Sequence, residues 1–105
     1  MATRIMSRRR ATAKLIEVLK TAREFILRPE NDFAWSGWDD AQDALEEFDA
    51  LTARLMKNSL PSRLELSVLF APTGPVQELS VSSGWGDEFL ALAIEFDAAL
   101  EEVYQ

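Results

Sequence analysis

The chain contains neither cysteine nor histidine. Without cysteine it can form no disulfide, no thiolate nucleophile and no cysteine-ligated zinc site. Without histidine it lacks the side chain that most often serves as a general base near neutral pH. Its four glycines do not form a glycine-rich phosphate loop. These absences predict a protein that is not an enzyme, and the lack of cysteine is typical of a cytoplasmic protein.

Long hydrophobic runs are also missing. No apolar stretch approaches the ~20 residues that a membrane-spanning helix requires. Of the 105 residues, 48% are hydrophobic and 28% are charged, as in ordinary globular proteins. The basic start, MATRIMSRRRATAKLIEVLK, lacks the continuous apolar segment and the cleavage site of a secretory signal. We predict a single domain over residues 1–105, in which residues 1–10 are a loose basic lead-in.

Positive charge is scarce in most of the chain, whose net charge is −7. Up to Arg28 there are eight basic and two acidic residues, whereas the remainder has three basic and sixteen acidic residues. A field of this sign repels nucleic acid and anionic membranes and attracts cationic partners. We therefore predict a basic protein as partner, and neither nucleic acid nor membrane. The alternative is that the basic start neutralises the acidic body within the fold.

Three segments have the spacing of amphipathic helices, because apolar side chains recur every three to four residues. The segments are residues 11–28, a stretch that follows Ser36 and ends near Asn58, and residues 86–103. Ser36 is predicted to cap the second helix, with Asp39 three residues later. In the third segment Leu90 and Ile94 widen the apolar stripe, so we expect this helix to lie deepest in the core.

Between the second and third of these segments the apolar period changes to two. RLELSVLF (63–70) and VQELSVSS (76–83) alternate apolar and polar side chains, which is typical of half-buried strands. The five residues between them suit a hairpin connection. We predict an α+β fold of three helices packed on one antiparallel β-hairpin, in the order α-α-β-β-α. An unpaired hairpin edge would permit homodimerisation, and a self-assembling structural subunit is one alternative function.

Two stretches, residues 36–50 and 83–98, begin with Ser-Gly-Trp and continue to Glu-Phe-Asp-Ala. Trp38 and Phe48 are ten residues apart, whereas Trp85 and Phe96 are eleven apart, so the stretches cannot superpose without an insertion. Both place acids just inside a predicted helix start, where the helix dipole favours negative charge. We interpret the likeness as helix-start chemistry used twice, and not as an internal repeat.

The second predicted helix begins with a dense group of carboxylates. The spacing of Asp39, Asp40 and Asp43 resembles the aspartate motif with which isoprenoid synthases bind magnesium and diphosphate, and Glu46 and Glu47 follow one turn later. Oxygen ligands of this kind suit Mg²⁺. A magnesium-dependent enzyme acting on a phosphorylated small molecule is therefore an alternative hypothesis. Those synthases need a much larger helical barrel, so we expect a solvated acidic face here, with no metal and no cofactor.

Aromatic side chains lie beside these acids in DFAWSGW. Tryptophan is enriched in interface hot spots because it offers a large rigid apolar area and one hydrogen-bond donor. Trp38 also fits the buried stripe of the second helix, whereas Trp35 has no evident internal role. We predict a non-enzymatic, acidic, cytoplasmic protein-interaction module, similar to an inhibitor, an immunity protein or an antitoxin that binds a basic protein. The predicted partner-binding residues are Trp35, Trp38, Asp39, Asp40, Asp43, Glu46 and Glu47.

Overall fold

The computed structural model describes the chain from residue 2 to residue 105, and its side chains from Arg8 onward. The described chain forms five α-helices and contains no β-strand. The helices are α1 (Ala2–Ile26), α2 (Ala41–Met56), α3 (Arg63–Phe70), α4 (Pro75–Ser83) and α5 (Gly86–Val103). The described fold is all-helical, and the prediction of an α+β fold with a β-hairpin is wrong.

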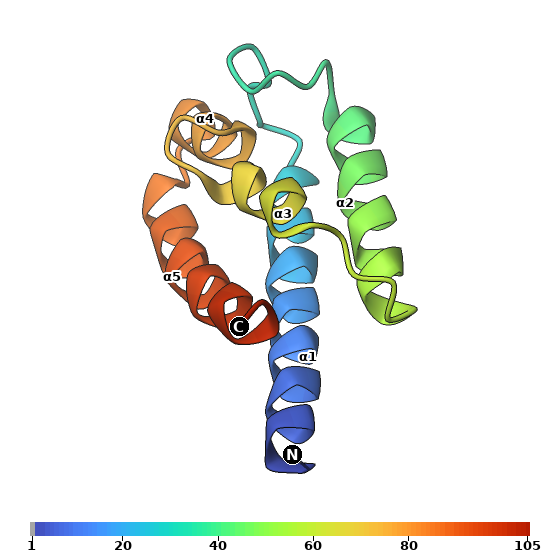
Figure 1. Cartoon of the computed structure of the whole chain (residues 1–105). Coiled ribbons are helices and arrows are strands. Elements are labelled where there is room, and N and C mark those ends of the chain that lie inside the picture. Colours follow the sequence, from blue (N-terminus) through green and yellow to red (C-terminus); the bar gives the residue numbers. More distant parts are fainter. Residues whose placement is uncertain (1) are drawn as a thin grey trace.

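Helix α1 is the central element of the fold (Figure 1). α2 packs along one of its sides and α5 along another, and both run in the opposite direction to α1. The short helices α3 and α4 pack on α5 and on each other. Because α1 is covered from several directions, it supplies much of the apolar core. Its buried residues are Ala11, Leu15, Val18, Leu19, Ala22 and Ile26.

α1 begins earlier than its apolar pattern predicts. The helix starts at Ala2 and not near Ala11, so residues 2–10 are helical instead of a loose lead-in. Met1 lies outside the described residues. The segment has no glycine or proline and contains several good helix formers. The first turns of α1 extend past the ends of α2 and α5 (Figure 1). Arg8 continues the apolar stripe in sequence but is exposed.

The segment predicted as the first strand is helix α3. The hydroxyl of Ser62 accepts a hydrogen bond from the backbone N–H of Glu65 at 3.2 Å, and the Glu65 carboxylate accepts one from the Ser62 N–H at 2.7 Å. This reciprocal capping box is encoded in the sequence as Ser-Arg-Leu-Glu, a known helix-start signal. The residues that α3 buries are Leu66, Leu69 and Phe70.

The segment predicted as the second strand is helix α4. Pro75 lies in its first turn, where the missing N–H needs no partner. The helix ends at Gly84, whose φ of 85° is in the left-handed region that glycine adopts without strain. Since the described residues form no strand, the predicted homodimer through a hairpin edge has no structural basis. The residues that α4 buries are Val76, Leu79 and Ser80.

The error has a simple geometric cause. Residues four apart lie on the same face of a helix and also on the same face of a strand. Leu66 and Phe70 therefore fit both structures. The two patterns differ at Leu64 and Val68, which the strand would have buried and which α3 leaves 70% and 45% exposed. They differ also at Leu69, which the strand would have exposed and which α3 buries. Over eight residues this difference is too small to decide the period.

The long helices agree better with their predicted bounds. α5 spans Gly86–Val103, which confirms the prediction for this segment. α2 begins at Ala41 with Asp40 as its N-cap, so the prediction that Ser36 caps it is wrong. Leu90 and Ile94 are 56% and 72% exposed and do not enter the core. The deepest helix is therefore α1, which packs against both α2 and α5.

Candidate functional site

The five carboxylates predicted to attract a partner lie together at the start of α2. Asp43, Glu46 and Glu47 are spaced by three and four residues, so they share one exposed side of α2, beside its buried stripe. All five side chains are exposed. We call this surface the acidic face, and its residues are Asp39, Asp40, Asp43, Glu46 and Glu47. The residues that α2 buries on its other side are Ala44, Phe48, Leu51 and Leu55.

Hydrogen bonds to backbone N–H groups hold the first carboxylates of the acidic face in place. The Asp40 carboxylate accepts a bond from the Asp43 N–H at 3.0 Å and caps α2. The Asp43 carboxylate accepts a bond from the Asp39 N–H, also at 3.0 Å. Such bonds satisfy N–H groups that have no partner within the helix, and the helix dipole favours negative charge at this end. The first acids of the acidic face therefore have a structural role, which is to cap the start of α2.

Trp38 is a core residue and not a surface anchor. Its side chain is only 8% exposed, and its ring meets the ring of Phe48 edge-on at 6.1 Å. Its indole N–H donates a hydrogen bond to the Glu47 carboxylate at 2.8 Å. This bond satisfies the one polar group of a buried indole and positions Glu47 at the surface. Trp38 is thus removed from the residues that a partner can contact directly.

Trp35, in contrast, is 75% exposed. It stands in the loop between α1 and α2, next to a tight turn. The N–H of Ser36 donates to the Phe33 carbonyl at 3.1 Å, and the Ser36 hydroxyl donates to the same carbonyl at 2.8 Å. The backbone N–H of Ala34 donates to the Asp32 carboxylate at 3.0 Å. A large aromatic side chain is therefore presented to solvent by a hydrogen-bonded loop close in sequence to the acidic face.

The loop is also attached to the far end of α4. The Ser83 hydroxyl accepts a hydrogen bond from the Asp32 N–H at 2.9 Å, and the Ser82 hydroxyl donates one to the Asp32 carbonyl at 3.0 Å. These contacts join residues about fifty positions apart in the sequence, and they restrict the loop that carries Trp35. An ordered loop loses less conformational entropy on binding than a flexible one.

Four basic residues with described side chains form ion pairs, and all of their partners are acids outside the acidic face. The ion pairs between different helices are Lys14–Glu95 at 3.2 Å, Arg23–Asp49 at 2.9 Å, Arg54–Glu65 at 3.0 Å and Arg63–Glu101 at 2.8 Å. The Asp49 carboxylate, through its hydrogen bonds and its charge, raises the pKa of Arg23. Two basic residues of α1 thus neutralise acids elsewhere in the fold, as the alternative interpretation of the charge pattern expects. Among the side chains described, none of the five on the acidic face forms an ion pair.

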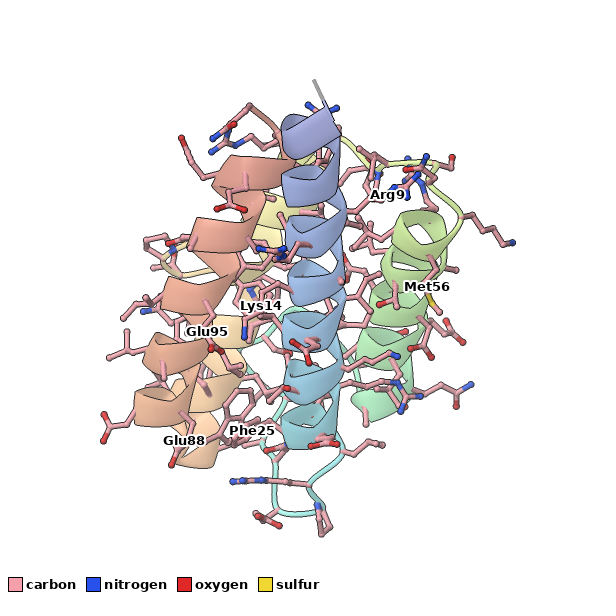
Figure 2. All side chains as sticks on the ribbon, turned by 90° about the horizontal axis from the view of Figure 1, so that it is seen from below. Arg9, Lys14, Phe25, Met56, Glu88 and Glu95 are labelled. Atoms are coloured by element: carbon pink, nitrogen blue, oxygen red, sulfur yellow. The ribbon has the colours of Figure 1, made fainter. Side chains whose placement is uncertain are left out.

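A shallow hollow of about 300 Å³ lies between α1 and α5. Figure 2 shows Lys14 and Glu95 pointing toward one another across it, and their atoms are 3.2 Å apart. Lys14 also lies 3.9 Å from Glu17. Since charges of both signs meet here, the hollow does not attract a charged ligand strongly. Its lining residues are Lys14, Glu17, Val18, Lys20, Thr21, Glu24 and Glu95.

Within residues 8–105, no three acidic side chains are placed to bind a metal ion together. This holds for the carboxylates of the acidic face, of which Asp39 and Asp40 precede α2 and the other three lie on it. None of the helices in the described part of the chain combines the length and apolar character needed to cross a bilayer. Comparisons with protein-family models, with curated proteins and with solved structures gave no match.

Proposed function

We propose that the protein is a non-enzymatic, cytoplasmic interaction module that binds a basic protein through the acidic face and Trp35. One observation carries the proposal. The acids that pair with basic residues of this chain, such as Asp49 and Glu65, lie outside the acidic face, whereas the acidic face remains unpaired within the described side chains. Its charge is therefore available to a partner, and the exposed ring of Trp35 stands close to it in the sequence.

The two parts of this surface have different roles in the proposed binding. Clustered carboxylates raise the rate of encounter with a basic partner, and salt screens this effect. Trp35 offers apolar area and an aromatic face on which an Arg or Lys side chain of the partner can stack. The carboxylates therefore act mainly on the association rate and Trp35 mainly on the dissociation rate. The absence of cysteine supports the cytoplasmic compartment.

A pair of matched variants tests the proposal. The first variant, Asp39→Asn with Asp43→Asn and Glu46→Gln, removes three charges from the acidic face and spares Asp40 and Glu47, whose side chains cap α2 and hold Trp38. The control variant removes three charges elsewhere, by Glu24→Gln, Glu30→Gln and Glu78→Gln. Both are used to capture basic proteins from cells of the source organism, and the association kinetics of a captured partner are then measured at increasing salt.

We expect association to slow as salt rises, and the acidic-face variant to associate about tenfold more slowly than the control variant. Trp35→Ala should speed dissociation and leave the association rate nearly unchanged. An association rate that is independent of salt contradicts the proposal. Equal slowing in the two triple variants also contradicts it, because net charge alone would then explain binding.

The magnesium hypothesis is tested separately by calorimetric titration of the chain with Mg²⁺ at millimolar concentration. The carboxylates of the acidic face spread along a helix surface, so we expect no saturable heat. Saturable binding that disappears in the acidic-face variant, and persists in the control variant, would favour the enzyme hypothesis over the interaction module.

A further inference from the structure

The side of α5 that faces solvent carries a row of apolar residues. Leu90 and Ile94 are 56% and 72% exposed, and Ala91 and Ala98 are also exposed. We call these four residues the α5 seam. They lie on the side of the helix opposite Phe89, Leu92 and Phe96, which are buried. α5 therefore has two apolar faces, of which the described fold covers only one.

The spacing of the α5 seam is that of a helix-packing surface. Ala91, Ile94 and Ala98 are separated by three and four residues, as are positions a and d of a coiled coil. The small alanines beside Ile94 allow a second helix to approach closely.

Single exposed apolar residues are common on protein surfaces. α3 exposes the pair Leu64 and Val68, whereas the α5 seam continues over four residues of one helix face. On α2, by contrast, Met56 at the C-terminal end is the only large apolar residue that is strongly exposed.

Carboxylates flank the α5 seam on both sides. Asp97 lies on one side of it and Glu102 on the other, and Asp87 lies at its N-terminal end; all three are exposed. None of these three forms an ion pair among the described side chains, whereas Glu95 and Glu101 pair with Lys14 and Arg63. The surface therefore combines an apolar centre with an acidic margin.

This charge pattern selects among the possible occupants of the seam. A second copy of α5 packed against the first would place acid against acid, which is unfavourable in a low-dielectric interface. An anionic membrane surface is repelled for the same reason. A helix with an apolar stripe bordered by Lys or Arg matches both the centre and the margin.

We propose that the α5 seam is a second docking surface, which receives an amphipathic helix with basic margins from a different protein. The proposal does not rest on the acidic face, because α5 and α2 pack on different sides of α1 (Figure 1). Contact with the α5 seam and with the carboxylates that flank it needs a partner helix of about four turns, or ~14 residues.

The probe is a fluorescein-labelled helical peptide of this length, with Leu and Ala on one stripe and Lys at the bordering positions. A matched peptide carries Glu in place of each Lys. Binding to the full chain is followed by fluorescence anisotropy, and the contact surface is located from backbone amide shifts in NMR spectra. We expect the Lys peptide to bind, the Glu peptide to bind at least tenfold more weakly, and the largest shifts to lie between Leu90 and Ala98.

Two single substitutions at equally exposed positions complete the test. Ile94→Asp places a charge in the centre of the α5 seam, and we expect it to weaken binding of the Lys peptide about tenfold or more. Leu64→Asp on α3 is the control, because Leu64 is 70% exposed and Ile94 is 72% exposed. We expect Leu64→Asp to change binding less than about twofold. The acidic-face variant should also bind the Lys peptide normally. Loss of partner binding at the acidic face and loss of peptide binding at the α5 seam can therefore be told apart.

Four outcomes would overturn the inference. They are equal weakening by Ile94→Asp and Leu64→Asp, a contact surface on α2 instead of α5, equal binding of the Lys and Glu peptides, and a homodimer that Ile94→Asp dissociates. The last result, measured by sedimentation, would assign the seam to a second copy of the chain.

Discussion

The indole N–H of Trp85 donates a hydrogen bond to the side-chain oxygen of Asn31, 3.0 Å away, and so joins the start of α5 to the end of α1. The side-chain amide of Asn31 donates in turn to the carbonyls of Phe25 and Ile26, at 2.8 and 2.9 Å. These are carbonyls at the end of α1, which lack partners within the helix. The Trp85 ring also stacks on Phe25, with ring centroids 4.9 Å apart. One asparagine thus closes a helix end and satisfies a buried tryptophan.

Replacing Asn31 tests this arrangement. Asn31→Ala removes the side-chain partner of the Ile26 carbonyl and of the Trp85 N–H. The Phe25 carbonyl keeps its bond from the Arg28 N–H at 3.2 Å. We expect the free energy of unfolding to fall by about 2–3 kcal/mol. Trp85→Phe removes the same donor together with some core volume. Urea unfolding of both single variants and the double variant measures the coupling. The double variant should lose less than the sum of the two single losses; strict additivity would show that the bond contributes nothing.

A glycine substitution probes the turn between α3 and α4. A Cβ atom on Gly74 would lie 2.5 Å from the Val68 carbonyl oxygen and 2.9 Å from that of Ala71. Both are backbone atoms, so the end of α3 would have to shift. We expect Gly74→Ala to reduce the free energy of unfolding by about 1–3 kcal/mol. Gly86→Ala is the control, since nothing lies within 4 Å of its Cβ position.

Thermal unfolding compares the two glycine variants. We expect Gly86→Ala to leave the melting temperature unchanged or to raise it slightly, because alanine favours the helix that begins there. A melting temperature for Gly74→Ala equal to that of the unsubstituted chain would mean that the turn tolerates a side chain.

The capping carboxylate of α3 makes stability depend on pH. The hydrogen bond from the Ser62 backbone lowers the pKa of Glu65, and the hydrogen bond from Arg54 lowers it further. Because the folded pKa is below the unfolded value of about 4.3, this stabilisation is fully present above the unfolded pKa. It is lost as the pH falls through the folded pKa.

Glu65→Gln should therefore flatten the dependence of unfolding free energy on pH in the acid range. Glutamine still accepts a hydrogen bond from Ser62, so the variant removes the titration more than the cap. The measurement is urea unfolding at several pH values between about 3 and 7, with Glu78→Gln as a control that lacks these partners. If the unfolding free energy of Glu65→Gln depends on pH as steeply as that of the unsubstituted chain, Glu65 is not the source of this pH dependence.

The two tryptophans of the Trp-Ser-Gly-Trp stretch should differ sharply in their effect on stability. Trp38 is 8% exposed and Trp35 is 75% exposed. We expect Trp38→Ala to reduce the free energy of unfolding by about 3–5 kcal/mol, as for other large residues removed from a core. We expect Trp35→Ala to change it by less than about 0.5 kcal/mol. Guanidinium unfolding of both variants checks the difference, and similar losses would show that Trp35 has a structural role.

The candidate site was only partly predictable from the sequence. Helical spacing places Asp43, Glu46 and Glu47 on one exposed side of α2, outside the buried stripe that contains Phe48, and this could be expected from the pattern alone. The apolar pattern did distinguish Trp38, which fits the buried stripe, from Trp35, which has no internal role, but it placed Trp38 within the helix, whereas Trp38 precedes α2. The pattern also placed Ile94 in the core. The sequence of a helix does not show whether another part of the chain covers an apolar residue that lies beside the buried stripe.

Local sequence determined the long helices of this protein and the breaks between them. Eighteen residues of apolar spacing are enough to define α5. The excess of acids after Arg28 makes the electrostatic field around this part of the chain negative in any fold. Tertiary structure decided the rest. The apolar spacing of the eight and nine residues of α3 and α4 fits two periods almost equally well. The capping box of α3 and the terminal Pro75 and Gly84 of α4 favour the helix locally, and burial against α5 adds to this preference. Which carboxylates obtain a basic partner depends on pairs such as Arg23–Asp49, which only chain folding brings together. Short segments depend on neighbours distant in sequence, because their intrinsic helix and strand preferences are smaller than the free energy of burial. Ion pairs depend on such neighbours because folding alone brings the two charges together.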